Sequence, residues 1–339
     1  MAVDLRDVAA ACGVSVATAS RALNGSPRVS ADTVRRVREA ADRLGYRPNA
    51  SARALRTSRS RFVGLVVTNL VNVSFHVIAE VVQQRLAERG YQMVLSVTGG
   101  DAAQELEALR MLADHSAEGV VVVGADAPAI DELRRLALPA VHLARRPDRP
   151  AGDCVLVDDL SGARDATAHL VGLGHRRIAV VCGPQTVTSG RERLAGYRLG
   201  LQDAGITEAS ELVLPGPFTP AHGRDAVGRL LALPARRRPT ALLVTNHEAA
   251  FGALPALHEA GVDVPGRLSV VCYEDAEIMR WWHPAVTVVD INPAEMGELA
   301  ARLLLERITG ARPGTTRPGE FRVGTHLTVR ASCGPPPPR

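Results

Sequence analysis

Residues 5–24 read LRDVAAACGVSVATASRALN, and this stretch decides the fold of the N-terminal end of the chain. Apolar residues recur at helical spacing up to Cys12, are interrupted at Gly13, and resume after Ser15. Gly13 can adopt the left-handed backbone that ends a helix, and Ser15 can cap the helix that follows. The pattern predicts a helix-turn-helix, a motif whose second helix enters the major groove of DNA.

The second predicted helix would turn one side toward DNA, made of Val16, Ala17, Ser20 and Arg21. Val16 and Ala17 are small and apolar, so they indicate contact with thymine methyl groups or packing rather than a hydrogen-bond code. A third helix is predicted from Ser30 to Leu44. Its apolar residues at helical spacing would close the core of the unit, and they are Val34, Val37, Ala41 and Leu44.

Positive charge is concentrated at the same end of the chain. Residues 1–61 contain 12 arginines and 5 acidic residues, whereas the remaining 278 residues contain 28 basic and 31 acidic ones, a net charge of −3. All 40 basic residues are arginine, a bias that a GC-rich genome would also produce. The clustering before residue 62, rather than the arginine content, therefore indicates nucleic-acid affinity at one end and another activity at the other.

Composition excludes several classes of protein. A chain of 339 residues that is 46% hydrophobic can form two or three domains, and no apolar run approaches the roughly 18 residues that span a bilayer. The N-terminus lacks a basic segment followed by an apolar one, so export is not expected. The five cysteines are scattered without metal-ligand or disulfide spacing. We therefore expect a cytoplasmic protein without a metal or other cofactor.

From Arg61 onward, short apolar runs alternate with amphipathic stretches. Strands are predicted at 62–67, 91–96, 119–123 and 140–143, and again at 177–182, 241–244 and 268–272. Helices are predicted near 75–89, 103–114, 128–136, 160–173, 190–204, 222–232 and 247–261. Such alternation gives parallel sheets with helices on both faces, and two series predict two lobes. Ligands of such folds bind at the carboxyl ends of the strands, in the crevice between the lobes.

Residues 44–60 continue the N-terminal unit with LGYRPNASARALRTSRS. Taken in order, the motifs Asp-Val-Ala, Gly-Val-Ser, Thr-x-Ser-Arg, Leu-Asn-Gly, Gly-Tyr-x-Pro-Asn and Ala-Arg-x-Leu make this chain resemble the lactose/galactose repressor (LacI/GalR) family. The resemblance extends more loosely through nearly the whole chain. It implies an all-α helix-turn-helix headpiece with a hinge helix, joined to an α/β two-lobed core like that of periplasmic binding proteins.

The segment between headpiece and core is predicted to form the hinge. Pro48 disfavours helix before it, and Asn49 can cap a short helix from Ala50 to about Arg56. About two turns are too short to be stable alone in water, so this helix should form when two copies pair over DNA. In the family a leucine of this helix wedges into the minor groove, and the resemblance assigns that position to Leu55. A flexible linker over 47–61 is the alternative.

The resemblance and the strand pattern together divide the chain. The expected limits are 1–46 for the DNA-binding domain and 47–61 for the hinge. The two-lobed domain is expected over 62–333, with an N-lobe of about 62–160 plus 291–319 and a C-lobe of about 161–290 plus 320–333. The tail 334–339 is rich in proline and is expected to be disordered. The residues expected to contact DNA are Leu5, Ser15, Val16, Ala17, Thr18, Ser20, Arg21, Asn24, Tyr46, Asn49, Ala52, Arg53 and Leu55.

The resemblance also implies an effector site, made of Asn69, Asn72, Phe75, Ser189, Arg193, Phe218, Asn246 and Glu274. Arg193 would grip ligand oxygens, with pairing to a neighbouring acid such as Glu192 as the alternative, and Phe218 would stack on the ligand. The chain departs from the family pattern in three places. The stretch from Asn69 to Phe75 lacks an acid, a proline and an aromatic residue, His247 replaces an acid, and Glu274 is one methylene longer than the usual aspartate. His247 can be a capping residue, a core residue or a ligand contact.

No Ser-His-Asp spacing, Gly-x-Ser-x-Gly motif, phosphate-binding loop or metal-ligand cluster is present, so a sensor is favoured over an enzyme. The resemblance implies a homodimer, or a tetramer, that represses genes of carbohydrate uptake or breakdown. It would bind a pseudo-palindromic operator on double-stranded DNA, be released by a small sugar-like effector, and have no membrane partner. We expect its dimer face on 77–86 and 101–114.

Two alternatives remain open. One is a corepressor-type regulator that binds DNA when a purine or similar metabolite is bound. The other is a cytoplasmic binding module or vestigial enzyme whose N-terminal helices only dimerise.

Overall fold

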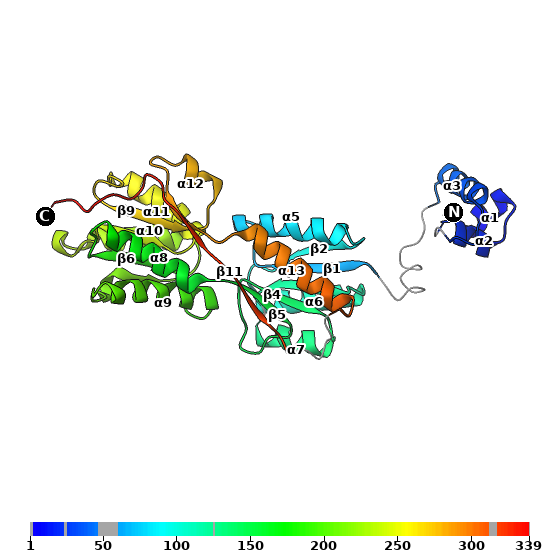
Figure 1. Ribbon diagram of the computed structural model, residues 1–339, viewed down its shortest axis with the longest axis horizontal. Coiled ribbons are helices and arrows are strands. Elements are labelled where there is room, and N and C mark those ends of the chain that lie inside the picture. Colours follow the sequence, from blue (N-terminus) through cyan, green and yellow to red (C-terminus); the bar gives the residue numbers. More distant parts are fainter. Residues whose placement is uncertain (1–2, 24–25, 47–59, 125, 312–316, 339) are drawn as a thin grey trace. The chain divides into compact units, whose positions relative to one another are not determined.

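The structure, a computed structural model, describes residues 3–23, 26–46, 60–124, 126–311 and 317–338. The chain separates into two compact units, residues 1–60 and residues 61–339 (Figure 1). The finer domain limits drawn from the sequence remain predictions.

The N-terminal unit is built from short helices with well-formed ends. Helix α1 (Leu5–Cys12) is capped by Asp4, whose carboxylate accepts the amide hydrogens of Arg6 and Asp7, and it ends at Gly13 with a φ of 63°. Helix α2 (Val16–Leu23) follows Ser15, whose Oγ atom accepts the amide hydrogen of Thr18 at 3.1 Å. Helix α3 (Ala31–Leu44) begins after Ser30 and ends at Gly45. The predicted helix-turn-helix is confirmed.

The core of this unit contains mostly small side chains. Ala9 of α1 and Ala19 and Ala22 of α2 are almost completely buried, and they let the helices approach closely. The other buried members of the core are Val8, Cys12, Val37, Ala40 and Ala41. Burial of Ala19 and Ala22 fixes which side of α2 faces outward.

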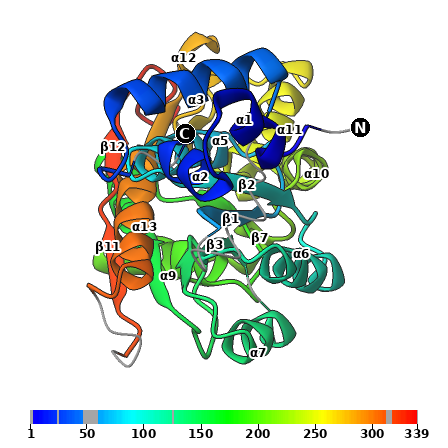
Figure 2. The same ribbon diagram turned by 90° about the vertical axis from the view of Figure 1, so that its right-hand side faces the viewer.

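The N-lobe of the second unit contains a parallel sheet in the order β11-β5-β4-β3-β1-β2. Its strands are β1 (Phe62–Val67), β2 (Gln92–Val97), β3 (Gly119–Val123), β4 (Ala140–Leu143), β5 (Asp153–Val157) and β11 (Glu320–Val323). Helices α6 (Ala102–Asp114) and α7 (Ala127–Arg135) pack on one face. Helices α5 (Val73–Ala87) and α13 (Pro293–Ile308) lie side by side on the other face (Figures 1 and 2).

The C-lobe contains the second sheet, in the order β12-β10-β9-β8-β6-β7. Its strands are β6 (Ile178–Cys182), β7 (Val213–Pro215), β8 (Ala241–Val244), β9 (Ser269–Tyr273), β10 (Thr287–Asp290) and β12 (His326–Thr328). Its helices are α8 (Asp159–Gly172), α9 (Thr188–Asp203), α10 (Pro220–Ala232), α11 (His247–Glu259) and α12 (Glu277–Trp281). Only β12 runs antiparallel among the pairings described for this sheet. The predicted two-lobed α/β core is confirmed.

The chain passes between the lobes after β5, after β10 and after β11 (Figure 1). The last passage differs from the prediction, which returned the chain to the C-lobe at residue 320. Residues 320–323 instead pair with β5, with Phe321 opposite Val155, so they belong to the N-lobe sheet. The short sequence EFRV alternates polar and apolar residues and does not read as a buried strand.

One further expectation stays a prediction and one differs from the structure. On α5, Ile78, Val82 and Leu86 are buried in the N-lobe core while Val77 and Val81 are half-buried, so a dimer face on 77–86 stays a prediction. The tail expected to be disordered from residue 334 is anchored at its start. The amide nitrogen of Gly334 donates to the Oγ atom of Ser269 at 3.0 Å, and the carbonyl oxygen of Gly334 lies 2.9 Å from Nε2 of His175.

Candidate DNA interface and ligand cavity

The outward side of α2 carries the residues predicted to read DNA. Val16 is 44% exposed, Ala17 and Arg21 are exposed, and Thr18 and Ser20 are half-buried. These side chains share one side of the helix because Ala19 and Ala22 occupy the opposite side in the core. The helix thus presents a small apolar surface next to one guanidinium group, a combination that fits base edges and phosphate.

Some of the other predicted DNA contacts lie in the headpiece, and the rest fall outside the described residues. Leu5 and Tyr46 are half-buried and pack against the headpiece core, while Ser15 is exposed and caps α2. These placements give Leu5 and Tyr46 a structural role in the unit. The rest of the set lies outside the described residues, namely Asn24, Asn49, Ala52, Arg53 and Leu55.

A cavity of about 240 Å³ lies between the lobes of the second unit, at the carboxyl ends of their strands. The residues predicted to bind the effector all line it: Asn69, Asn72, Phe75, Ser189, Arg193, Phe218, Asn246 and Glu274. The strand ends converge there in parallel sheets, so residues from distant parts of the sequence meet. The cavity is the candidate ligand site, and we name it the ligand cavity.

The N-lobe wall of the ligand cavity is held by asparagines. The Oδ1 atom of Asn69 accepts the amide hydrogen of Asn72 at 2.8 Å, and the Oδ1 atom of Asn72 accepts that of Ser74 at 2.9 Å. Asn72 thereby caps α5. Both side chains use their carbonyl oxygens for structure, which leaves their amide groups to face the cavity or its far wall.

Arg193 is the central charged group of the C-lobe wall. Its Nε atom lies 2.8 Å from Asp159, its Nη1 atom donates to the main-chain oxygen of Thr245 at 2.5 Å, and its guanidinium stacks over the ring of Tyr273 at 4.4 Å. Burial disfavours its charge, but Asp159 and Glu274 outweigh burial and raise the pKa of Arg193. Arg193 is therefore paired with an acid, as the alternative expected, but the acid is Asp159, because Glu192 pairs with Arg322 at 2.8 Å.

Asp159 was missed at the sequence level, although it lines the ligand cavity. It follows β5, a strand that the sequence did not predict, so its place at a strand end could not be recognised. Burial raises the pKa of Asp159 to about 6, against the opposing charge of Arg193. A buried carboxylate has only acceptor atoms, so it suits ligand hydroxyl or N–H donors.

Glu274 connects the two lobes. Its Oε2 atom accepts a hydrogen bond from Ser74 of the N-lobe at 3.0 Å and lies 2.6 Å from Nδ1 of His247 in the C-lobe. Burial disfavours the carboxylate, but the charge of His247, with help from Arg193 and Ser74, lowers the pKa of Glu274 to about 2. Its backbone has a φ of 69°, a left-handed conformation that is uncommon outside glycine. Such a conformation points to a constrained position at the cavity wall.

His247 is a core residue of the cavity wall rather than a lining residue. It is completely buried at the start of α11, behind Glu274. The amide nitrogen of Val73 in the N-lobe lies 3.4 Å from its Nε2 atom. The neighbouring Asn246 caps α11 through Oδ1, at 3.1 Å from the amide nitrogen of Ala249, so its NH₂ group is left to the cavity. The acid-to-histidine change thus acts on the ligand site through Glu274.

Phe218 closes one side of the ligand cavity. A Cβ atom added to Gly183 would lie 2.1 Å from the ring of Phe218, so glycine at 183 creates the space in which the ring lies. On the N-lobe side, Phe75 is buried and lines the same cavity. The cavity therefore combines two aromatic rings with carboxylates, amides and a guanidinium, as small-molecule sites do.

Other lining residues also went unpredicted as ligand contacts. Polar or small ones are Ser74, Gly99, Gly100, Ala144, Arg145, Thr219 and Glu248. Arg145 follows the predicted strand 140–143, so the rule that singled out Asn69 would have found it too. None of the helices in the described ranges has the length and apolar character of a membrane crossing. The described residues also contain no cluster of His, Cys, Asp and Glu arranged to hold a metal ion.

A helix-turn-helix unit followed by a two-lobed core with a polar cavity defines a DNA-binding regulator that senses a small molecule. A model of bacterial regulatory proteins, lacI family, matches residues 4–49, and a periplasmic binding protein-like domain matches residues 167–333. The HTH-type transcriptional repressor PurR of Aliivibrio fischeri is 32% identical, over 90% of this chain and 91% of its own length. PurR of Haemophilus influenzae is 31% identical, over 97% and 98%.

Solved structures of transcriptional regulators are similar to this chain over nearly its whole length. The transcriptional regulator CelR in complex with cellobiose is 34% identical with a TM-score of 0.74, covering 97% of this chain and 99% of that one. The lac repressor dimer bound to operator and the anti-inducer ONPF is 28% identical with a TM-score of 0.87, covering 98% and 99%. The chain belongs to the lacI family of bacterial regulatory proteins and is a ligand-responsive, DNA-binding transcriptional regulator.

Proposed function

We propose that this regulator is a repressor that a small, sugar-like effector releases from its operator. The observation that carries the proposal is the set of buried acceptors and donors around the ligand cavity. Asp159, Glu274, Arg193 and Asn246 all line it, and each is at least nine-tenths buried. These groups are paired within the protein, and their remaining donor and acceptor positions suit a partner rich in hydrogen-bonding atoms, such as a molecule with adjacent hydroxyl groups. The cellobiose complex of the relative CelR supports a saccharide.

Contacts between the lobes near the ligand cavity give the effector a means to act. Among them are Ser74 to Glu274 at 3.0 Å, Val73 to His247 at 3.4 Å, and Asn69 to Glu248 at 3.5 Å. A ligand that inserts among these groups must change the spacing of the lobes. The resulting difference in free energy between two states is the coupling to DNA, about 1–3 kcal/mol per site in typical cases.

The DNA-bound form is proposed to be a dimer, with one α2 helix in each half of a pseudo-palindromic operator. The exposed edge strand β2 supports this, because Leu95 and Val97 are 39% and 46% exposed on it. Met111 of α6, within the predicted face 101–114, is 37% exposed. Unpaired strand edges with apolar residues favour association. The lac repressor relative is a dimer on operator.

The corepressor alternative rests on two observations. The rings of Phe75 and Phe218 both line the ligand cavity and would suit a planar base. The curated relatives named above are PurR repressors. In this alternative the ligand would strengthen operator binding instead of weakening it.

A thermal-shift screen of saccharides and nucleobases tests the proposal. A ligand that binds only the folded protein must raise Tm, and we expect a saccharide to do so. Arg193→Ala should abolish the rise. Because Arg193 also holds Asp159, Phe218→Ala is the second variant, since it changes the cavity wall and keeps the ion pairs. Arg224→Ala, at an exposed pair with Glu259, is the control and should keep the full rise. A response to nucleobases alone would support the corepressor.

A salt titration tests whether the headpiece binds DNA at all. Phosphate contacts by arginines release counterions, so log affinity must fall linearly with log salt concentration. DNA selected from a random pool provides the probe. A flat slope, or no selected sequence, would favour the binding-module alternative in which the N-terminal helices only dimerise.

A further inference from the structure

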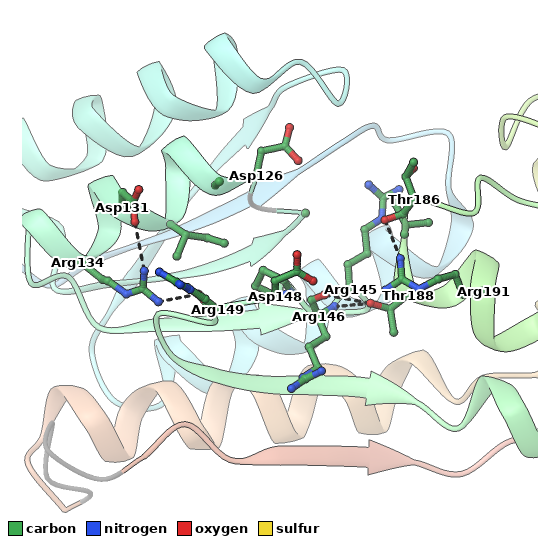
Figure 3. Close-up of a pocket in the computed structure, with 15 residues that line it drawn as sticks. Asp126, Asp131, Arg134, Arg145, Arg146, Asp148, Arg149, Thr186, Thr188 and Arg191 are labelled. Carbon is green, nitrogen blue, oxygen red and sulfur yellow. Dashed lines mark hydrogen bonds and ion pairs between the residues drawn. The ribbon is translucent and has the colours of Figure 1, made fainter.

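A second cavity of about 440 Å³ lies beside the ligand cavity, and arginines dominate its wall (Figure 3). We name it the arginine cavity. Its walls come from the start of α7, from the loop 145–149 between β4 and β5, and from the loop that precedes α9. Arg145 lines both cavities. The two cavities are therefore neighbours that share a wall residue.

The charges of the arginine cavity are unbalanced. Five arginines line it (Arg134, Arg145, Arg146, Arg149 and Arg191) against three aspartates (Asp126, Asp131 and Asp148), a difference of +2. Arg134 is paired with Asp131 at 3.2 Å, and Arg146 is paired with Glu320 at 3.1 Å. Among the residues that the structure describes, no hydrogen bond or ion pair holds the guanidinium groups of Arg145 and Arg149.

Arg145 differs from Arg193, the other arginine of the ligand cavity, in its pairing. Arg193 is buried and has Asp159 beside it, and its pKa is raised. Arg145 is half-buried, and burial lowers its pKa more than the nearby charges of Glu105, Asp126 and Glu248 raise it. A guanidinium that has lost part of its hydration without full compensation by carboxylates is stabilised by an incoming anion.

Helix ends add to the positive potential of this cavity. Neither α7 nor α9 has a side-chain cap on its first amide groups, and the first residue of each, Ala127 and Thr188, lines the cavity. Free amide hydrogens at helix N-termini attract anions. The hydroxyl of Thr188 is instead bonded to the backbone of Arg146, at 3.1 Å from its nitrogen and 3.0 Å from its oxygen. That contact joins the two lobes at the cavity wall.

We propose that the arginine cavity binds a phosphate group of the effector, whose uncharged part occupies the ligand cavity. The inference rests on the proposed function, because it defines the class of effector as a phosphorylated, sugar-like molecule. Arg145 stands between the two parts and contacts the phosphate with its planar fork of donors. Arg149 and the amides at the start of α9 complete the site. The same contacts would hold the lobes at a fixed distance.

Thermal shift of the full chain with inorganic phosphate and pyrophosphate as probes tests the anion site without knowledge of the sugar. Sodium chloride at matched ionic strength is the reference. Phosphate should raise Tm of the wild type above this reference. Arg145→Gln should weaken phosphate binding by about tenfold or more, as expected on loss of a charge-assisted hydrogen bond, and Arg145→Lys should restore part of it.

Two control variants make the result specific. Arg224→Gln removes an exposed arginine of the C-lobe, and Arg21→Gln removes one from the headpiece, where phosphate could also bind. Both should keep the full response. No rise above the chloride reference would overturn the inference. A response that Arg145→Gln retains, or that Arg21→Gln loses, would overturn it as well.

Operator binding by the wild type separates this inference from the proposed function. If neutral saccharides release the operator and phosphate does not bind, the phosphate site fails and the repressor remains. If a phosphate site is found but no saccharide, neutral or phosphorylated, weakens operator binding, the proposed effector response fails and the anion site remains.

Discussion

The Nδ1 atom of His247 lies 2.6 Å from the Oε2 atom of Glu274, and the two side chains are exposed by 0% and 5%. At this distance a protonated His247 forms an ion pair with the Glu274 carboxylate. Glu274 also accepts a hydrogen bond from Ser74 across the cleft. The pair therefore belongs both to the ligand site and to the contact between the lobes.

This ion pair predicts a pH dependence of stability. Burial lowers the pKa of His247 from its ordinary 6.5, but Glu274 outweighs burial and raises it. The stabilisation is therefore complete below pH 6.5 and is lost as the pH rises through the raised value. The contact with the Val73 amide, which only neutral imidazole accepts, opposes this trend weakly because it is long, at 3.4 Å.

The measurement is Tm of the wild type and of His247→Gln over a pH series. The difference should be largest near about pH 6 and should shrink as the pH approaches about 9. A difference that stays constant over this range, or that grows, would contradict a charged His247.

Removal of the carboxylate predicts a larger loss. Glu274→Gln leaves the buried His247 without its counter-ion, and breaking a buried pair from one side costs about 3–5 kcal/mol of unfolding free energy. Glu259→Gln breaks the exposed pair with Arg224 and should cost far less, because solvent screens that pair. Urea denaturation measures both. The double variant Glu274→Gln, His247→Gln should recover part of the loss. Equal losses of unfolding free energy in Glu274→Gln and Glu259→Gln would refute the buried pair.

Packing of α8 against α9 gives a further prediction. A Cβ atom at Gly196 would lie 2.2 Å from the main-chain oxygen of Leu160, so Gly196→Ala must displace one helix and should destabilise the fold by about 1–3 kcal/mol. Gly228 of α10 has no atom within 4 Å of the corresponding position. Gly228→Ala should instead stabilise by about 0.5–1 kcal/mol, because alanine is the better helix former. In urea denaturation, a lower unfolding free energy for Gly196→Ala and a higher one for Gly228→Ala would confirm the α8–α9 packing.

The headpiece predicts a change in salt dependence. Arg21 is exposed on the same side of α2 as Val16 and Ala17. If it contacts a phosphate, Arg21→Ala should weaken binding to all DNA sequences and reduce the slope of log affinity against log salt by about 1. If it contacts a base, specificity at one operator position should relax instead. Unchanged affinity and specificity would remove α2 from the interface, and Arg224→Ala serves as the control.

Much of this fold could be predicted because long runs of valine and leucine, such as those of β1 and β3, are unambiguous as buried strands. The strands that were not predicted are β5, β7, β10, β11 and β12, each of three to five residues. Val213–Pro215 has only three residues, and Glu320–Val323 alternates polar and apolar side chains. Their pairing depends on tertiary contacts rather than on local pattern.

Some residues of the candidate site could be recognised from the sequence, and others only from the structure. Family motifs pointed to Arg193 and Asn246, whereas Asp159 required knowledge of β5, and the role of His247 behind Glu274 is visible only in three dimensions.

The most direct test of ligand-released repression is a titration of operator DNA with the full-length protein, with and without the saccharide or sugar phosphate found by thermal shift. Fluorescence anisotropy should show operator affinity reduced by about 5- to 150-fold at saturating ligand, the range given by a coupling of about 1–3 kcal/mol. The Phe218→Ala variant should bind operator with the same affinity whether the ligand is present or absent. An operator affinity that is unchanged or increased by the ligand would contradict release by the effector.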